Sequence, residues 1–310
     1  MSTTLNSGID PASFSAVTGP AQDLFRYVNG PWIDMYRLPD DRSRYGSFDK
    51  LAEDAENQIR EILEVDDCPA EKSHALYASF LDVDAINASG LAAIEDQLKA
   101  IDVAADKAEL TRSLGAMNPA GGPDLIGIAV YGDPGAPETN IIHVEQAGLG
   151  LPDEAYYRED HYAPIREAYV DMVAKQLKNA KLAADSEQAE ADAKRFLDVE
   201  TRIAANHWDN VATRDSVKTY NPTDYAELSA MLADYDLDTW IESWQSAYDQ
   251  TSAAQVQPLD FRGIFNHVVV HEPSFLTGLN AFWKAADLDD LKLWARVHVI
   301  IGSTLELPHE

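Results

Sequence analysis

The stretch DLIGIAVYGDPGAPETNIIHVEQ, residues 124–146, decides the fold class, because here the helical spacing of apolar residues gives way to another pattern. Two runs rich in β-branched residues flank a loop of Gly, Pro, Asp and Asn, which predicts a β-hairpin. A lone hairpin is only marginally stable in water, so this one must pack on helices or pair with another strand.

Helical spacing returns on both sides of the hairpin. Before it, apolar residues predict helices at 49–63, near 71–88 and at 91–101, with Pro69 marking an end or break after the first. After it, helices are predicted at 165–177, at 189–203, within 219–232 with Thr223 as N-cap, at 237–248 and over 273–301. The predicted fold is therefore mostly α, a multi-helix domain with one small β-hairpin at about 124–146.

The charge and the cysteine content limit which classes of binding partner and which cellular compartment are expected for the chain. The chain has 53 acidic and 24 basic residues, a formal charge of −29. Nucleic acids and anionic membranes attract clustered Lys and Arg, and no basic stripe is present, so neither partner is expected. The single cysteine, Cys68, fits a reducing compartment. Residues 1–17 do not resemble a signal peptide, and no apolar run approaches ~20 residues, so a cytoplasmic location is expected.

The stretch HVVVHE, residues 267–272, carries two histidines at the spacing that zinc peptidases use on a helix. Three consecutive valines favour a strand instead. On a strand, residues four apart are separated by about 13 Å, at about 3.3 Å per residue, which is too far for one zinc ion with bonds of about 2.1 Å. Val268 also stands where the catalytic Glu of the zinc motif would be, so no metal ligand is predicted here.

No other arrangement predicts a catalytic centre. The remaining histidines form no ligand pair at helical spacing. Glu200 and His207 fall two turns apart on one predicted helix face, which favours a polar pair facing a neighbour or solvent. Cys68 follows an acidic stretch that disfavours the thiolate, so it is a poor nucleophile. From the residues alone we predict no catalytic and no metal-binding residue.

Five stretches resemble, in order, the neprilysin family of zinc metallopeptidases, which includes the endothelin-converting enzymes and bacterial oligopeptidases. They are DLFRYVNGPWIDMYRLPDDRSRYGSFDKL (23–51), LYASFLDVDAINASGL (76–91), HVEQAGLGLPDEAYYREDHY (143–162), VETRIAANHWDNVATRDSVKTYN (199–221) and VVVHEPSFLTGLNAFW (268–283). The combination of YVNGPW, RYGSF and GLGLPDEAYY is specific to this family.

The resemblance implies the N-terminal half of a longer peptidase, which is inactive alone. In the family, the His-Glu-x-x-His motif and its zinc lie in a C-terminal catalytic domain, which is missing here; this chain itself holds no cofactor. The implied domain covers residues 21–303, and in the family it closes over the catalytic domain to enclose a chamber for oligopeptide substrates. A flexible arm at 1–20 precedes this domain, and an atypical tail at 304–310 follows it. We therefore expect apolar surface that the missing domain would cover.

The resemblance also implies one substrate-binding residue, Arg44 in RSRYGSF. The matching arginine of neprilysin contacts the C-terminal carboxylate of short substrates, a role that suits a guanidinium fork. The alternative, from the residues alone, is that Arg44 orders the loop before the predicted 49–63 helix. A second substrate arginine of neprilysin is replaced by Ala52, which predicts weaker carboxylate recognition.

Two rival functions stay open. A standalone helical module for peptide binding or protein interaction would use the same cavity without catalysis, and it requires a self-sufficient core. A small metal hydrolase would use His267, His271 and nearby acids, against the strand geometry described above.

Because the ligand set of a zinc peptidase is missing, we expect the isolated chain to bind no stoichiometric zinc and to hydrolyse no peptide. Metal analysis of the purified chain and a peptide-cleavage assay check this expectation. One tightly held zinc ion per chain, lost in a His267→Ala variant, would contradict it.

Overall fold

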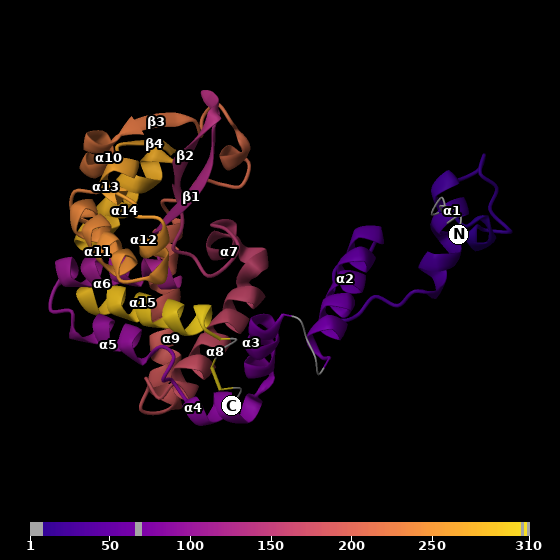
Figure 1. The fold of residues 1–310 in the computed structure, drawn as a ribbon, viewed down its shortest axis with the longest axis horizontal. Helices are drawn as coiled ribbons and strands as arrows, with labels where there is room; N and C mark the ends of the chain where they lie inside the picture. The colour runs from indigo at the N-terminus through magenta and orange to yellow at the C-terminus, as the bar shows by residue number, and fades with distance from the viewer. Residues whose placement is uncertain (1–8, 66–69, 305–306, 309–310) are drawn as a thin grey trace. The chain divides into compact units, whose positions relative to one another are not determined.

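The structure, a computed structural model, describes residues 9–65, 70–304 and 307–308. Backbone contacts divide the chain into two compact units, Met1–Leu81 (unit 1) and Asp82–Glu310 (unit 2), which are taken separately below. The predicted mostly α fold is confirmed (Figure 1). Cys68, Pro69 and His309 lie outside the described residues, and the predicted domain limits at 20/21 and 303/304 stay predictions.

The secondary-structure elements found in the described residues of unit 1 are all helices. It contains the 3₁₀ helix η1 (Pro11–Ser13) and the helices α1 (Leu24–Met35), α2 (Ser47–Leu63) and α3 (Glu71–Leu81). Within the predicted arm at 1–20, residues 1–8 are outside the described part. The following stretch contacts α1, because the Ser15 amide donates to the Tyr27 carbonyl (2.7 Å).

Unit 2 combines helices with a sheet. Its first half contains α4 (Val83–Ser89), α5 (Glu95–Val103), α6 (Lys107–Met117), η2 (Asn118–Ala120), β1 (Ile126–Asp133), β2 (Ala136–Gln146), α7 (Ala155–Arg158), η3 (Asp160–Tyr162), α8 (Ala163–Asn179) and α9 (Ser186–Ala204). Its second half contains η4 (Ala212–Arg214), β3 (Asn221–Asp224), α10 (Tyr225–Met231), α11 (Leu237–Asp249), α12 (Ser252–Val256), α13 (Phe261–Ile264), β4 (His267–Val270), α14 (Pro273–Ala285) and α15 (Leu288–Gly302).

The sheet has the strand order β1-β2-β4-β3. The predicted hairpin is confirmed as the antiparallel pair β1–β2, and it pairs with a further strand as expected. That strand is β4, which runs parallel to β2 with Ile142 opposite Val268, while β3 adds to it in antiparallel direction. Valines 268–270 are buried, as β-branched residues in an inner strand usually are.

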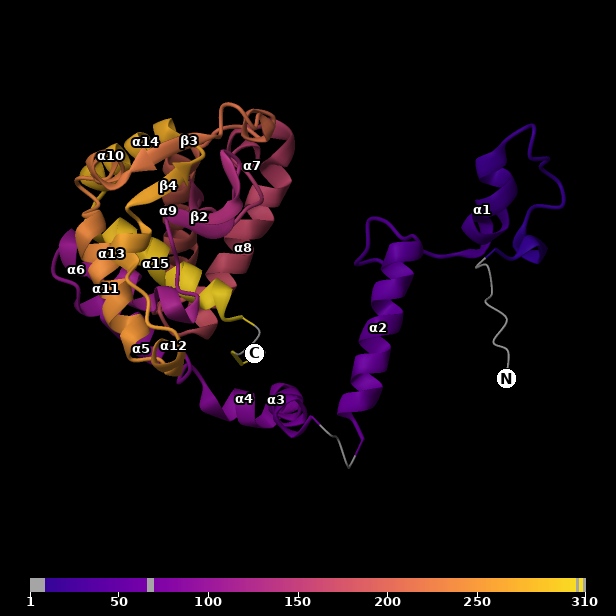
Figure 2. The ribbon, with the colours of Figure 1, turned by 45° about the horizontal axis from the view of Figure 1, so that its top comes forward.

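The core lies in unit 2 and is crossed by α15. This helix contacts α5, α8 and α9, and it buries Trp294, Val297 and Ile300 among other residues. Figures 1 and 2 show α15 in yellow among these helices, with the sheet toward one end of the unit and α5 toward the other. The predicted inward face of α9, which includes Phe196 and Ile203, is buried as expected.

Unit 1 has no comparable core. Every apolar side chain that is buried in the described residues lies at or after Ile94, in unit 2. The predicted apolar face of α2 is present, but Leu51, Ile59 and Ile62 are exposed on it. Taken by itself, unit 1 is an amphipathic helical segment with exposed apolar side chains. The apolar surface that a missing domain would cover stays a prediction.

Two predicted helices are each interrupted at an aspartate that precedes the next helix. The helix predicted near 71–88 divides at Asp82, whose carboxylate accepts the Ala85 amide (3.0 Å). The pattern over 273–301 divides into α14 and α15 at Asp287, whose backbone is extended. Aspartate is a preferred N-cap residue, so the cap at Asp82 overrides the continuous apolar period, whereas at Asp287, which makes no side-chain cap hydrogen bond, the extended backbone ends it.

Two further predictions differ from the structure. Thr223 was predicted as an N-cap but lies in β3, and Asp224 caps α10 by accepting the Glu227 amide (2.9 Å). Helix α6 occupies a stretch for which no element was predicted; Asp106 caps it and its apolar residues face α11.

No helix in the described parts of the chain is both long and apolar enough to cross a lipid bilayer. The cytoplasmic location expected from the sequence stays a prediction.

The α8–α9 contact gives a test of the core. Val173 on α8 is fully buried, whereas Val103 on α5 is exposed. Truncating a buried valine removes two methyl groups and leaves a cavity, so Val173→Ala should lower the free energy of unfolding by about 2 kcal/mol. The matched Val103→Ala variant should change it by less than about 0.5 kcal/mol. Urea denaturation measures both, and equal effects would show that this helix pair does not form the core.

Candidate functional site

The stretch HVVVHE forms a strand, as predicted. His267–Val270 is β4, and His271 follows it in a bend, with its amide bonded to the Val144 carbonyl (2.9 Å). His267 is exposed at the start of the strand. The two histidines therefore do not share the helix face that the zinc motif requires.

His271 has a partner that the sequence did not indicate. Its Nε2 lies 2.8 Å from Nδ1 of His143, which is 5% exposed and comes from β2. Glu145 Oε1 lies 3.7 Å from the same Nε2, and the Tyr131 ring packs edge-on against His143. Since one nitrogen of the pair must donate and the other accept, the two facing nitrogens cannot both carry protons.

The donor set around this pair does not fit a bound metal. Across the described residues, no three or more His, Cys, Asp or Glu side chains are grouped so that they could hold an ion.

Glu272, the last residue of the stretch, is a buried carboxyl at 3% exposure. Its Oε2 accepts the Gln146 amide (3.0 Å) and so ties the start of α14 to the end of β2. Burial raises the pKa of Glu272 to about 7, and Glu145 adds to the rise. The pKa of His271 is lowered, by burial first and by His143 as well.

A second buried carboxylate, Glu200 on α9, organises the GLGLPDEAYY stretch. Glu200 is 0% exposed and accepts hydrogen bonds from the Gly150 amide and the Tyr157 hydroxyl (2.8 Å each). Nε2 of His298 on α15 lies 2.8 Å from it. This contact joins α15 to α9.

The predicted pairing of Glu200 with His207 on one helix face is wrong. Helix α9 ends at Ala204, so His207 falls beyond it, while Glu200 points into the core. His207 Nε2 lies 3.0 Å from the Ala147 carbonyl. Burial lowers the pKa of His207 to about 4, so the ring is neutral at physiological pH.

The two glycines of this stretch are required by its geometry. Gly148 has φ +93°, in the left-handed region, and its carbonyl accepts the Trp294 indole N–H (3.0 Å). A Cβ on Gly150 would lie 2.0 Å from the Tyr169 hydroxyl and 3.2 Å from Glu200. The stretch is therefore a close-fitting connection between the sheet and the helices.

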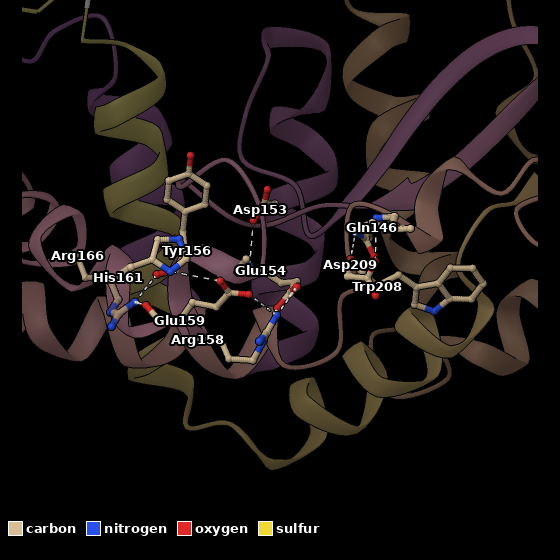
Figure 3. A network of polar contacts seen from close by, with 12 residues as sticks. Gln146, Asp153, Glu154, Tyr156, Arg158, Glu159, His161, Arg166, Trp208 and Asp209 are labelled. Atoms are coloured by element: carbon tan, nitrogen blue, oxygen red, sulfur yellow. Dashed lines mark hydrogen bonds and ion pairs between the residues drawn. The ribbon is translucent and has the colours of Figure 1, made fainter.

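A polar network surrounds this connection (Figure 3). The Gln146 side chain donates to the Trp208 carbonyl (3.0 Å) and accepts from the Trp208 amide (2.7 Å). Arg158 reaches both Glu154 and Glu159, at 3.0 and 3.2 Å. These groups are engaged with one another, which indicates that the network orders loops rather than carries out chemistry.

Arg44, the predicted substrate residue, lies in the loop before α2 in unit 1, and Ala52 is exposed on α2 itself. Residues next to Arg44 in the sequence fix the conformation of that loop through contacts with α2. Glu53 pairs with Arg42 (3.3 Å) and accepts the Tyr45 hydroxyl (2.7 Å). Arg44 itself is exposed and has no hydrogen bond or ion pair with any residue that the structure describes. The loop-ordering role that the sequence left open therefore falls to Arg42 and Tyr45.

Aromatic residues beside this loop line a hollow in unit 1. The Tyr45 ring stacks on Tyr36 (4.5 Å), which stacks on Trp32 (4.6 Å). A cavity of about 350 Å³ is bounded by Phe25, Trp32, Tyr45 and Lys50 among others. An apolar wall with cationic groups close by can accept an apolar side chain and an anionic group.

Comparisons with known proteins agree on one family. Residues 20–310 match the N-terminal domain of peptidase family M13. Human neprilysin is 25% identical over 94% of this chain and 42% of its own length. Endothelin-converting enzyme 1 of Cavia porcellus is 23% identical over 91% of this chain and 38% of its own.

Solved structures show the same relation. The Mycobacterium tuberculosis zinc metalloprotease Zmp1, in complex with an inhibitor, superposes with a TM-score of 0.84 at 31% identity. The match covers 98% of this chain and 45% of that one. The chain thus spans less than half the length of the relatives that it matches.

The buried carboxyl of Glu272 predicts a pH dependence of stability. Its pKa, raised from 4.5 to about 7, means that the folded chain keeps a proton that the unfolded chain loses between these values. Stability from this group is complete below about pH 4.5 and is lost as the pH rises through 7. Glu272→Gln keeps an acceptor for the Gln146 amide but cannot ionise, so it should stabilise the chain at pH 8 by on the order of 1 kcal/mol.

At pH 4 the difference between Glu272→Gln and the wild type should vanish. Comparing the two proteins cancels the other titrating groups, such as His207, whose pKa is lowered and whose contribution runs the opposite way. Chemical denaturation at both pH values measures the effect, with Glu138→Gln, exposed on β2, as control. A pH-independent difference would contradict the assignment.

Proposed function

The chain belongs to peptidase family M13, and from this membership we propose that it forms the N-terminal, chamber-forming half of a zinc metalloendopeptidase acting on oligopeptides. Its match to less than half of each relative supports a catalytic partner domain of comparable size. The observation that carries the proposal is the uncovered apolar surface of unit 1.

That surface is large and aromatic. On α1, Trp32 is 43% exposed, and on α2, Phe48 is 87% exposed. Leu76 and Phe80 on α3 are also exposed. Exposed apolar residues of this kind favour a surface that a partner covers. A catalytic domain packing against these helices is the partner proposed.

The proposed zinc belongs to that partner. The donor set of the described residues does not fit a metal, and the buried carboxylates Glu200 and Glu272 are already engaged in hydrogen bonds. In this proposal the chain supplies no catalytic group. Its contribution is to enclose the substrate and to bind part of it.

Arg44 is the residue proposed to bind substrate. Its loop is held by Arg42 and Tyr45 through Glu53, so the Arg44 guanidinium is left for another partner. A guanidinium binds a carboxylate through two parallel hydrogen bonds, which suits the C-terminus of a short peptide.

A standalone peptide-binding module is the second candidate. The observation in its favour is the complete core of unit 2, which runs from Ile94 to Leu307 without help from another chain. This candidate leaves the exposed helices of unit 1 unexplained, so the peptidase half is preferred.

The two candidates differ when a catalytic half is supplied. We expect the chain alone to bind an apolar-surface dye and to cleave no peptide. Fused to the C-terminal half of the mycobacterial metalloprotease that it resembles, it should lose dye binding and gain peptide hydrolysis. Unchanged dye binding in the fusion, together with a cooperative, monomeric chain, would favour the standalone module.

The active fusion then tests Arg44. Hydrogen bonds to charged groups contribute about 1.5–3 kcal/mol, so Arg44→Ala should lower kcat/KM about tenfold on short peptides with a free C-terminus. Peptides with an amidated C-terminus should be cleaved nearly as before. Arg37→Ala, an exposed arginine of the same unit, is the matched control. Equal losses on both kinds of peptide would make Arg44 structural.

A further inference from the structure

The His143–His271 pair joins two strands of the sheet that come from distant parts of the sequence. His143 lies on β2 opposite Val269 of β4, and His271, two residues after Val269, reaches the same face of the sheet. The facing ring nitrogens, His143 Nδ1 and His271 Nε2, are 2.8 Å apart. The pair is therefore a side-chain contact across the parallel β2–β4 junction, just before the chain enters α14.

The two rings differ in their freedom to move. His143 is buried on a strand that is paired on both sides, with Ala129 of β1 and Val269 of β4 opposite it. Its other ring nitrogen, Nε2, is also buried and has no hydrogen-bond partner in the described part of the chain. The His271 side chain is 23% exposed and lies in the bend after β4. When the contact breaks, His271 is therefore the ring that moves.

One carboxylate lies close to the more mobile ring. Glu145 Oε1 is 3.7 Å from His271 Nε2, and the Glu145 side chain is 41% exposed. Tyr131 of β1 packs edge-on against His143, and the side-chain amide of Asn221 lies 3.4 Å from the His271 carbonyl. A phenol and an amide are both uncharged near neutral pH. Glu145 is thus the group toward which a positively charged His271 ring is drawn.

The other charged groups on the neighbouring elements have other partners. Glu272, at the start of α14, accepts the Gln146 amide. Asp133 of β1 interacts with the exposed His267 at the opposite end of β4. Asp224 of β3 caps α10. The proton balance of the pair is therefore set by the two rings, by their burial and by Glu145.

Proton uptake changes the contact in two steps. In the uncharged pair, one facing nitrogen donates and the other accepts. One added proton keeps the hydrogen bond, because an imidazolium N–H donates to a neutral ring nitrogen. A second proton places an N–H on both facing nitrogens and two positive charges side by side, which breaks the bond. Burial lowers the pKa of His271, which outweighs the opposite effect of Glu145, so this step falls below the ordinary histidine value of about 6.5.

We propose that the His143–His271 pair is a proton-controlled latch on the sheet. With one proton or none the latch is closed, and His271 holds the connection between β4 and α14 against β2. With two protons it is open, and the His271 ring turns away from His143 toward Glu145. The His271 amide, which donates to the Val144 carbonyl (2.9 Å), is then loosened. This device lies within unit 2 and does not depend on the function proposed above.

Nuclear magnetic resonance of the whole chain, with its histidines labelled with ¹⁵N, tests the contact directly. A scalar coupling between His143 Nδ1 and His271 Nε2 exists only while a hydrogen bond joins them. The coupling should be present at pH 8 and lost by pH 5. A coupling that persists at pH 5, or that is absent at pH 8, would overturn the proposal.

Hydrogen exchange tests the consequence for the backbone. After correction for the intrinsic pH dependence of exchange, the His271 amide should lose protection about tenfold between pH 8 and pH 5, the equivalent of one hydrogen bond. His271→Gln still donates and accepts but does not titrate, so the amide of residue 271 should keep its protection in this variant. His267→Gln, which removes the exposed histidine at the other end of β4, should behave like the wild type.

Glu145→Gln separates a latch from a merely structural pair. The variant removes the charge that favours protonated His271, so opening should move to lower pH by about half a pH unit. Glu138→Gln, exposed on the same strand, should leave the opening pH unchanged. Thermal melts at both pH values show that each variant is folded. Equal loss of protection in the wild type and His271→Gln, or an opening pH that Glu145→Gln does not move, would contradict the latch.

Discussion

The buried carboxylate of Glu200 is the constraint on which the rest of unit 2 depends. A carboxyl group at 0% exposure is tolerated only when it is fully hydrogen-bonded, and here its partners come from two segments other than α9. Gly150 and Tyr157 lie in the connection after β2, and His298 lies on α15. Satisfying Glu200 therefore fixes this connection, α9 and α15 against one another at the same time.

Further hydrogen bonds link the region around Glu200 to the sheet. The Trp294 indole bonds to Gly148, Gln146 holds Trp208, and Glu272 accepts the Gln146 amide. Each contact joins the end of a strand to a helix or loop far away in the sequence. Unit 2 consequently has its own core, whereas the described residues of unit 1 contain neither a buried apolar side chain nor such a buried polar centre.

The parts of the fold that could be predicted are those set by sequence patterns a few residues long. The hairpin, the strand in HVVVHE and the inward face of α9 follow from β-branched runs and helical period, which act over a few residues. The His143–His271 pair could not be found, because its members are separated by 128 residues and come together only through the pairing of β2 with β4. The break at Asp82 was missed because a single capping carboxylate outweighs a continuous apolar period, and the break at Asp287 was missed because it is a local change to extended backbone within such a period. The sequence likewise could not show that Arg44 has no hydrogen bond or ion pair with a described residue, since this depends on which neighbours reach Glu53.

The parallel pairing of β2 with β4 also bears on how the chain reaches this structure. Ile142 pairs with Val268, a sequence separation of 268 − 142 = 126 residues. Closing so long a loop costs entropy before any contact repays it, and long-range pairings slow folding. During synthesis the β1–β2 hairpin leaves the ribosome well before β4 does. The edge of β2 that pairs with β4 therefore stays unpaired until residue 268 has been synthesised. In that interval the nascent chain carries a strand edge open to mispairing, a hazard that ends only when β4 is inserted.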